Sequence, residues 1–177
     1  MTRSNVVFRV DATDASDQRL DVEIEVEAPF TASSLKLSFP RWVPGSYFLR
    51  EPIQHVSHLQ ATDGDGKPLN VVRKDVDSIV IKGVSSLAKV CIRYKLLCVE
   101  NTVRSNHLDD THLHMMPPFT WFLPTSGIDA KRMNETHTVE FTLPSDWNVS
   151  TQLTFQQTSS HDSGQRHTFT AEHRDAL

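Results

Sequence analysis

Glycine is scarce in this sequence, with 6 glycines among 177 residues. No glycine-rich loop of the kind that cradles a phosphate group occurs, and the Gly-x-Ser-x-Gly motif of many serine hydrolases is absent. The nearest approach is DGDGKP at positions 63–68, which is typical of a hairpin turn. These absences argue against a nucleotide-binding enzyme and against a serine hydrolase.

Cysteine is also rare, with Cys91 and Cys98 in the run KVCIRYKLLCVE as the two examples. If this run is a strand, the two residues lie roughly 23 Å apart at about 3.3 Å per residue. A disulfide requires Cα atoms within about 7 Å. We therefore expect two free, buried thiols, as in a reducing compartment.

Neither sign of charge dominates, and long apolar runs are missing. The formal net charge is −4, with acidic and basic residues interspersed, so we expect no nucleic-acid partner. The apolar runs are only a few residues long, so we expect no membrane contact, and the N-terminal MTRSNVVF has no signal core. These features predict a cytoplasmic protein. With 38% hydrophobic residues, the sequence is sufficient for one domain spanning residues 1–177.

The dominant pattern is a period of two. RLDVEIEVE, residues 19–27, alternates apolar and acidic side chains, which is typical of a strand with one buried and one solvated face. No segment keeps a helical period over three turns. We expect an all-β fold, an antiparallel β-sandwich or a large curved sheet with little helix. The further strands predicted lie at residues 6–10, 34–39, 55–62, 69–72, 77–83, 88–97, 137–143 and 166–172.

The stretch FPRWVPGSYFLREP, residues 39–52, concentrates rigid and bulky residues. Pro40 cannot donate a ladder hydrogen bond, so the preceding strand ends there or lies at an edge. Pro44-Gly45 fits the centre of a type II turn, with proline setting φ near −65° and glycine taking the positive φ. The main interpretation is a rigid corner whose rings cap the end of the core. The alternative is an aromatic platform facing a ligand or a partner domain.

This stretch and its surroundings resemble the N-terminal domain of the glycyl aminopeptidase family, zinc metallopeptidases that often carry a PDZ domain. The resemblance covers most of the chain. The segment IRYKLLCVENTVRSNHLDD resembles a further part of that domain, and FTAEHRDAL resembles the stretch where it leads into the catalytic domain. The residues that match the family's Pro-x-Trp-x-Pro-Gly-x-Tyr pattern and the arginine after it are Pro40, Trp42, Pro44, Gly45, Tyr47 and Arg50.

The catalytic motif of that family is missing from this sequence. Such enzymes bind zinc through His-Glu-x-x-His on a helix, with the glutamate as general base. No His-Glu pair occurs among the 177 residues. The resemblance therefore implies a non-catalytic scaffold without a catalytic residue or cofactor of its own. It would pack against the zinc-binding catalytic domain of the same polypeptide and help to wall its substrate cleft.

The segment NHLDDTHLHMMPPFTWFLP, residues 106–124, holds the remaining candidates. His112 and His114 could bind zinc if a strand placed both imidazoles on one face, with His107 or Asp110 as a third ligand. The alternative is a polar loop that leads to the apolar residues after it. The resemblance further implies that Met115, Phe119 and Trp121 lie at a cleft or an interface. If a catalytic domain covers them, residues 115–122 should form an exposed apolar face here, through which the domain could self-associate.

Two other interpretations stay open at this stage. The chain could be a free-standing binding module for a peptide or a sugar, with Trp42, Tyr47 and Trp121 as its platform. It could also be a small metal-binding protein that uses His112 and His114. A His-Glu-x-x-His motif in the reading frame beyond Leu177 would favour the scaffold over both.

Overall fold

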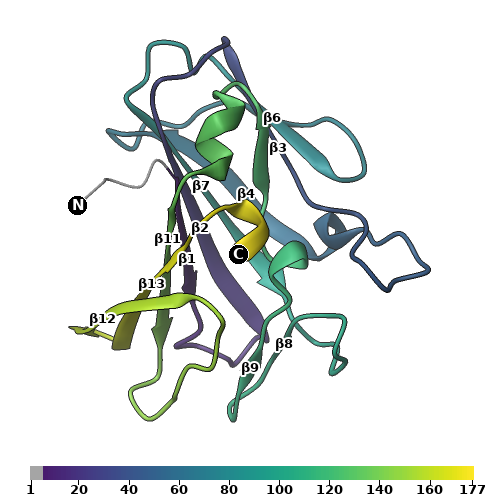
Figure 1. Cartoon of the computed structure of the whole chain (residues 1–177), viewed down its shortest axis with the longest axis vertical. Coiled ribbons are helices and arrows are strands. Elements are labelled where there is room, and N and C mark those ends of the chain that lie inside the picture. The colour runs from purple at the N-terminus through teal and green to yellow at the C-terminus, as the bar shows by residue number, and fades with distance from the viewer. Residues whose placement is uncertain (1–5) are drawn as a thin grey trace.

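Alternating apolar residues build most of the strands in the structure, a computed structural model that describes residues 6–177 (Figure 1). The all-β fold is confirmed, and the helical residues described lie in four short 3-10 helices, η1 to η4. No described helix has the length and apolar character needed to cross a membrane. The strands are β1 (Val6–Asp11), β2 (Arg19–Glu27), β3 (Ser34–Ser38), β4 (Val56–Asp63), β5 (Val71–Arg73), β6 (Ser78–Lys82), β7 (Lys89–Leu97), β8 (His107–Leu108), β9 (Leu113–His114), β10 (Leu123–Ser126), β11 (His137–Leu143), β12 (Thr154–His161) and β13 (Gly164–Ala171).

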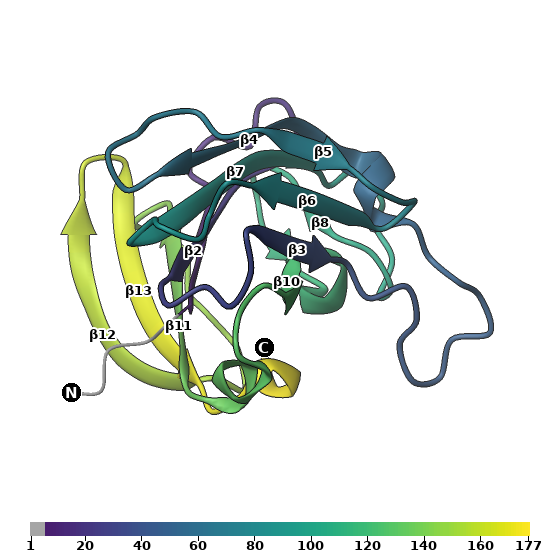
Figure 2. The same cartoon turned by 90° about the horizontal axis from the view of Figure 1, so that it is seen from above.

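Two sheets form the body of the domain. The larger has seven strands in the order β12-β13-β11-β1-β2-β7-β4, and the smaller has four in the order β10-β3-β6-β5. Figure 2 shows the large sheet curving around the side of the smaller one. One expectation is wrong in part: β1 pairs with β11 in parallel, so the large sheet is mixed rather than purely antiparallel. The parallel pair joins the antiparallel strands β1-β2-β7-β4 to the antiparallel strands β11-β13-β12.

The predicted turn at residues 63–68 forms and closes a short hairpin, with an antiparallel bridge between Thr62 and Pro68. Gly66 has φ +83°, and the Asp63 amide donates to the Lys67 carbonyl at 3.0 Å. The strands on either side, β4 and β5, belong to different sheets. The turn therefore carries the chain from the large sheet to the small one.

The core lies between the two sheets and follows the predicted alternation. On β2, the apolar residues are buried, and Glu23 and Glu25 lie on the opposite face. There Arg9 of β1 binds Glu23 at 2.7 Å, and Lys89 of β7 binds Glu25 at 3.0 Å. Cross-strand ion pairs thus cover the outer face of the large sheet.

A cluster of buried aromatic rings fills the centre of the core. Phe8 packs on Trp121 with ring centroids 5.3 Å apart, and Phe39 packs on Phe122 at 4.1 Å. The Tyr94 hydroxyl donates to the Thr120 carbonyl at 2.6 Å, which provides a partner for a backbone group that is buried with the rings. Residues 120–122 therefore run through the core as part of it.

Candidate functional site

The loop between β3 and η1 (Pro52–His55) projects from the body of the domain (Figure 2). Its turn is the one that the sequence predicts: the Ser46 amide donates to the Val43 carbonyl at 3.1 Å, and Gly45 has φ +83°. Ser46 is buried within the loop and accepts from the Trp42 indole through its carbonyl at 2.8 Å. The loop ends where the Arg50 amide donates to the Arg41 carbonyl at 2.7 Å. Residues 41–50, named here the aromatic loop, thus hold a shape set by their own hydrogen bonds.

The side chains of the aromatic loop point outward. The exposed fractions are 54% for Trp42, 98% for Tyr47, 67% for Phe48 and 64% for Leu49. The expectation that these rings cap the core is wrong, because the backbone bonds of the loop are satisfied locally and the core is already closed by Phe39 and Phe122. The alternative, a set of rings presented to a partner, agrees with this exposure.

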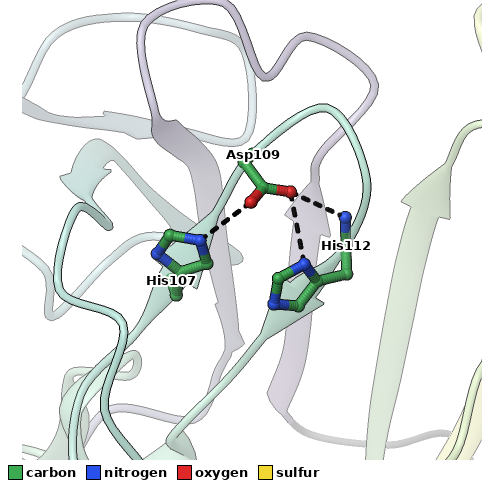
Figure 3. A group of neighbouring side chains, drawn as sticks. All are labelled: His107, Asp109 and His112. Atoms are coloured by element: carbon green, nitrogen blue, oxygen red, sulfur yellow. Dashed lines mark hydrogen bonds and ion pairs between the residues drawn. The ribbon is translucent and has the colours of Figure 1, made fainter.

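A second candidate lies at the turn between β8 and β9, where three potential metal ligands meet (Figure 3). One ligand atom from each of His107, Asp109 and His112 lies within 4.8 Å of the others. His107 Nε2 is 3.0 Å from one carboxylate oxygen of Asp109, and His112 Nδ1 is 3.2 Å from the other. His107 is buried, whereas His112 is exposed. His114 is not in this group, so the structure assembles a different set from the predicted pair of His112 and His114.

The Asp109 carboxylate is already occupied by the turn. Its Oδ1 accepts from the Thr111 amide at 2.8 Å, the Thr111 hydroxyl at 2.6 Å and the His112 amide at 3.0 Å. These bonds to Thr111, together with the one from His107, hold the pKa of Asp109 well below its usual range. A catalytic zinc site needs fixed ligands, an open position for water and a base beside that water. In this group, Asp109 Oδ1 is bonded within the turn and Asp109 Oδ2 lies 3.0 Å from His107 Nε2, so both carboxylate oxygens already have partners.

A cleft of about 510 Å³ lies beside this turn, within the size range of ligand pockets. One wall is formed by the β9 region and the segment after it, and the other by β11 and the loop of residues 146–153. The cleft brings together His112, His114, Met115 and Trp121, as well as Trp147, which the sequence analysis did not single out. Phe119 does not line it and lies instead at a smaller cavity of about 80 Å³ with Arg50.

The predicted exposed apolar face at residues 115–122 is wrong. Phe119, Trp121 and Phe122 are 6%, 1% and 0% exposed, so Trp121 also cannot form a surface platform with Trp42 and Tyr47. One cause of this burial is Asn106, which is itself buried. No sequence pattern pointed to this residue. Its amide nitrogen donates to the Phe119 carbonyl at 3.1 Å, and its oxygen accepts from the Met116 amide at 2.7 Å. These bonds hold the segment inward.

The sequence matches one known domain family. The family model described as the peptidase M61 N-terminal domain matches residues 7–177. The chain belongs to the peptidase M61 N-terminal domain family. The resemblance to the N-terminal domain of glycyl aminopeptidases is thereby confirmed. A search of curated proteins found no match.

Solved structures share the fold of this M61 N-terminal domain. An aminopeptidase N family protein from Idiomarina loihiensis superposes with a TM-score of 0.81 at 21% identity, over 97% of this chain and 28% of that chain. An M1 zinc metallopeptidase mutant from Deinococcus radiodurans, bound to a Tyr-Ser-Ala substrate, has a TM-score of 0.50 at 13% identity, over 94% and 38% of the two chains. The chain thus spans about a third of the length of these structural relatives.

Proposed function

We propose that this chain is the non-catalytic N-terminal scaffold domain of a glycyl aminopeptidase-like zinc metallopeptidase. In this role it packs against the catalytic domain of the same polypeptide and helps to wall the substrate cleft. The observation that carries the proposal is the family match over residues 7–177. The zinc ligands and the general base belong to the catalytic domain, because the chain has no His-Glu-x-x-His motif.

The geometry of the domain supports a scaffold. The chain devotes its strands to two sheets with a continuous apolar core. The two imidazoles that meet at the β8–β9 turn, those of His107 and His112, both contact the Asp109 carboxylate. Met115 lines the 510 Å³ cleft, with the buried Trp121 behind it, and we assign this cleft to the wall because it lies within the size range of ligand pockets.

The test is the activity of the full-length polypeptide. The reading frame beyond Leu177 should encode a His-Glu-x-x-His motif on a helix. The purified full-length protein should retain zinc after dialysis and release glycine or alanine from aminoacyl anilides. A frame without that motif, or a full-length protein that neither binds zinc nor turns over these substrates, would refute the proposal.

A further inference from the structure

The apolar side chains of the aromatic loop stand out from the rest of the described surface. Residues 6–177 have nine exposed large hydrophobic residues, and four of them lie in this one loop: Trp42, Tyr47, Phe48 and Leu49. The other five are four valines and one phenylalanine, at positions 72, 76, 99, 103 and 155. Single exposed apolar residues are normal, whereas a concentration of large ones marks an interaction site.

The loop is also organised in a way that favours binding. Its hydrogen bonds centre on Ser46: the Trp42 indole donates to the Ser46 carbonyl, and the Ser46 hydroxyl donates to the Phe48 carbonyl at 3.0 Å. Arg41 binds Glu51 at 3.5 Å at the base. A loop with a preset backbone loses little conformational entropy on association. Aromatic residues in the centre with charged residues at the edge match the composition of protein interfaces.

From these observations we infer that the aromatic loop is the docking element that holds this domain against the catalytic domain of the same polypeptide. The inference rests on the proposed function. Tyr47, Phe48 and Leu49 would enter an apolar recess of the catalytic domain. The ring of Trp42, which is anchored to Ser46, would cover the edge of that contact.

The position of the loop favours this occupant over a second copy of the chain. In Figure 2 the aromatic loop and the C-terminal η4 (Arg174–Ala176) both extend toward the lower side of the view, away from the curved outer face of the large sheet. A domain that follows Leu177 on that side would meet the loop. In the structural relative from Idiomarina loihiensis, the matched part is 28% of the chain, so most of that chain lies outside this domain.

The experiment measures thiol accessibility in the full-length protein. Tyr47→Cys and Leu49→Cys place a reporter in the loop, and Phe155→Cys is the matched control on the edge strand β12. Phe155 is 57% exposed, less than Tyr47 or Leu49. Native Cys91 and Cys98 are buried. Labelling by a maleimide, quantified for each peptide by mass spectrometry, should be at least about tenfold slower at positions 47 and 49 than at 155, which corresponds to about 1.4 kcal/mol or more of protection.

The outcomes separate this inference from the proposed function. If the full-length enzyme binds zinc and is active, but positions 47 and 49 react as fast as position 155, the docking inference is wrong and the proposed function stands. If protection disappears on dilution, a second copy covers the loop, and the inference is also wrong. As a second measurement, Tyr47→Ser/Phe48→Ser/Leu49→Ser should separate the calorimetric unfolding of the two domains, whereas Phe155→Ser should leave it coupled.

Discussion

Gly45 occupies a backbone conformation that side chains with a Cβ rarely adopt. Its φ is +83°, but no atom lies within 4 Å of the position that a Cβ would take, so the cost of substitution is conformational rather than steric. Gly45→Val should lower the free energy of unfolding by more than about 1 kcal/mol, since a β-branched residue is poorly tolerated at positive φ. Chemical denaturation measures this. Gly127→Val should cost more, because a Cβ there would overlap the Ser34 carbonyl oxygen. A Gly45→Val curve that overlays the parent curve would contradict the prediction.

The two cysteines should be chemically inert in the folded domain. Burial raises the pKa of the Cys98 thiol to about 12, and burial together with the nearby Glu25 carboxylate raises the pKa of Cys91. The reactive species is the thiolate, which is therefore scarce at about pH 8. A disulfide reagent such as DTNB should react with neither thiol of the native protein on the time scale of minutes, and with both after denaturation. Rapid reaction of one thiol in the native state would show that its strand opens.

At the scale of elements, the β8–β9 turn should depend on the charge of Asp109. The carboxylate accepts from Thr111, His107 and His112, and its pKa is lowered, so it stabilises the fold above its unfolded pKa of about 4. That contribution is lost as the pH falls through the lowered folded pKa. Asp109→Ala should therefore be less stable than Asp110→Ala, which removes the same charge from an exposed neighbour.

The difference in stability between Asp109→Ala and Asp110→Ala should depend on pH. The difference in denaturation midpoint should be largest near neutral pH and should narrow below about pH 4, because the free-energy advantage of an ionised Asp109 shrinks once the unfolded chain takes up the proton. A difference that grows on acidification would mean that Asp109 does not act as a hydrogen-bonded carboxylate.

The strands that the sequence predicts most clearly are those with one buried face. β1, β2 and β3 alternate between buried and less buried residues, and the structure places them as expected. The sequence did not predict β12, which lies at the edge of the large sheet with nearly all of its residues exposed. Because neither face of this strand is buried, its sequence does not alternate between apolar and polar residues. The parallel pairing of β1 and β11 depends on residues far apart in the chain, which local pattern does not report.

The sequence predicted which kinds of residue the candidate sites contain, but not how the structure arranges their side chains. Pro44-Gly45 predicted its turn because the two residues fix their own dihedral angles. The direction of the neighbouring rings depends on what already fills the core, and a local motif carries no information on that. The ligand cluster shows the same limit: His107 and His112 are separated along the chain, and only the bend at Asp109 brings their ring centroids to 5.1 Å.

At the scale of the whole molecule, the proposed division of labour between a scaffold domain and a catalytic domain has a direct consequence. Residues 1–177 alone should neither bind zinc tightly nor hydrolyse aminoacyl substrates. His-Glu-x-x-His supplies two ligands and a base from one helical face, because residues four apart share that face. The nearest substitute among the described residues is the group of His107, Asp109 and His112, whose carboxylate is bound in the turn.

The decisive assay compares purified residues 1–177 with the full-length protein. After dialysis, the domain should hold far less than one zinc per chain, and it should release no glycine or alanine from aminoacyl anilides, with or without added zinc. Alanine substitutions at His107, His112 and His114 test the remaining ligands one by one. Stoichiometric zinc that disappears in these variants, together with zinc-dependent turnover, would show that the domain has a site of its own. If the domain has no such site, the role that we propose for it is to dock on the catalytic domain through the exposed rings of the aromatic loop.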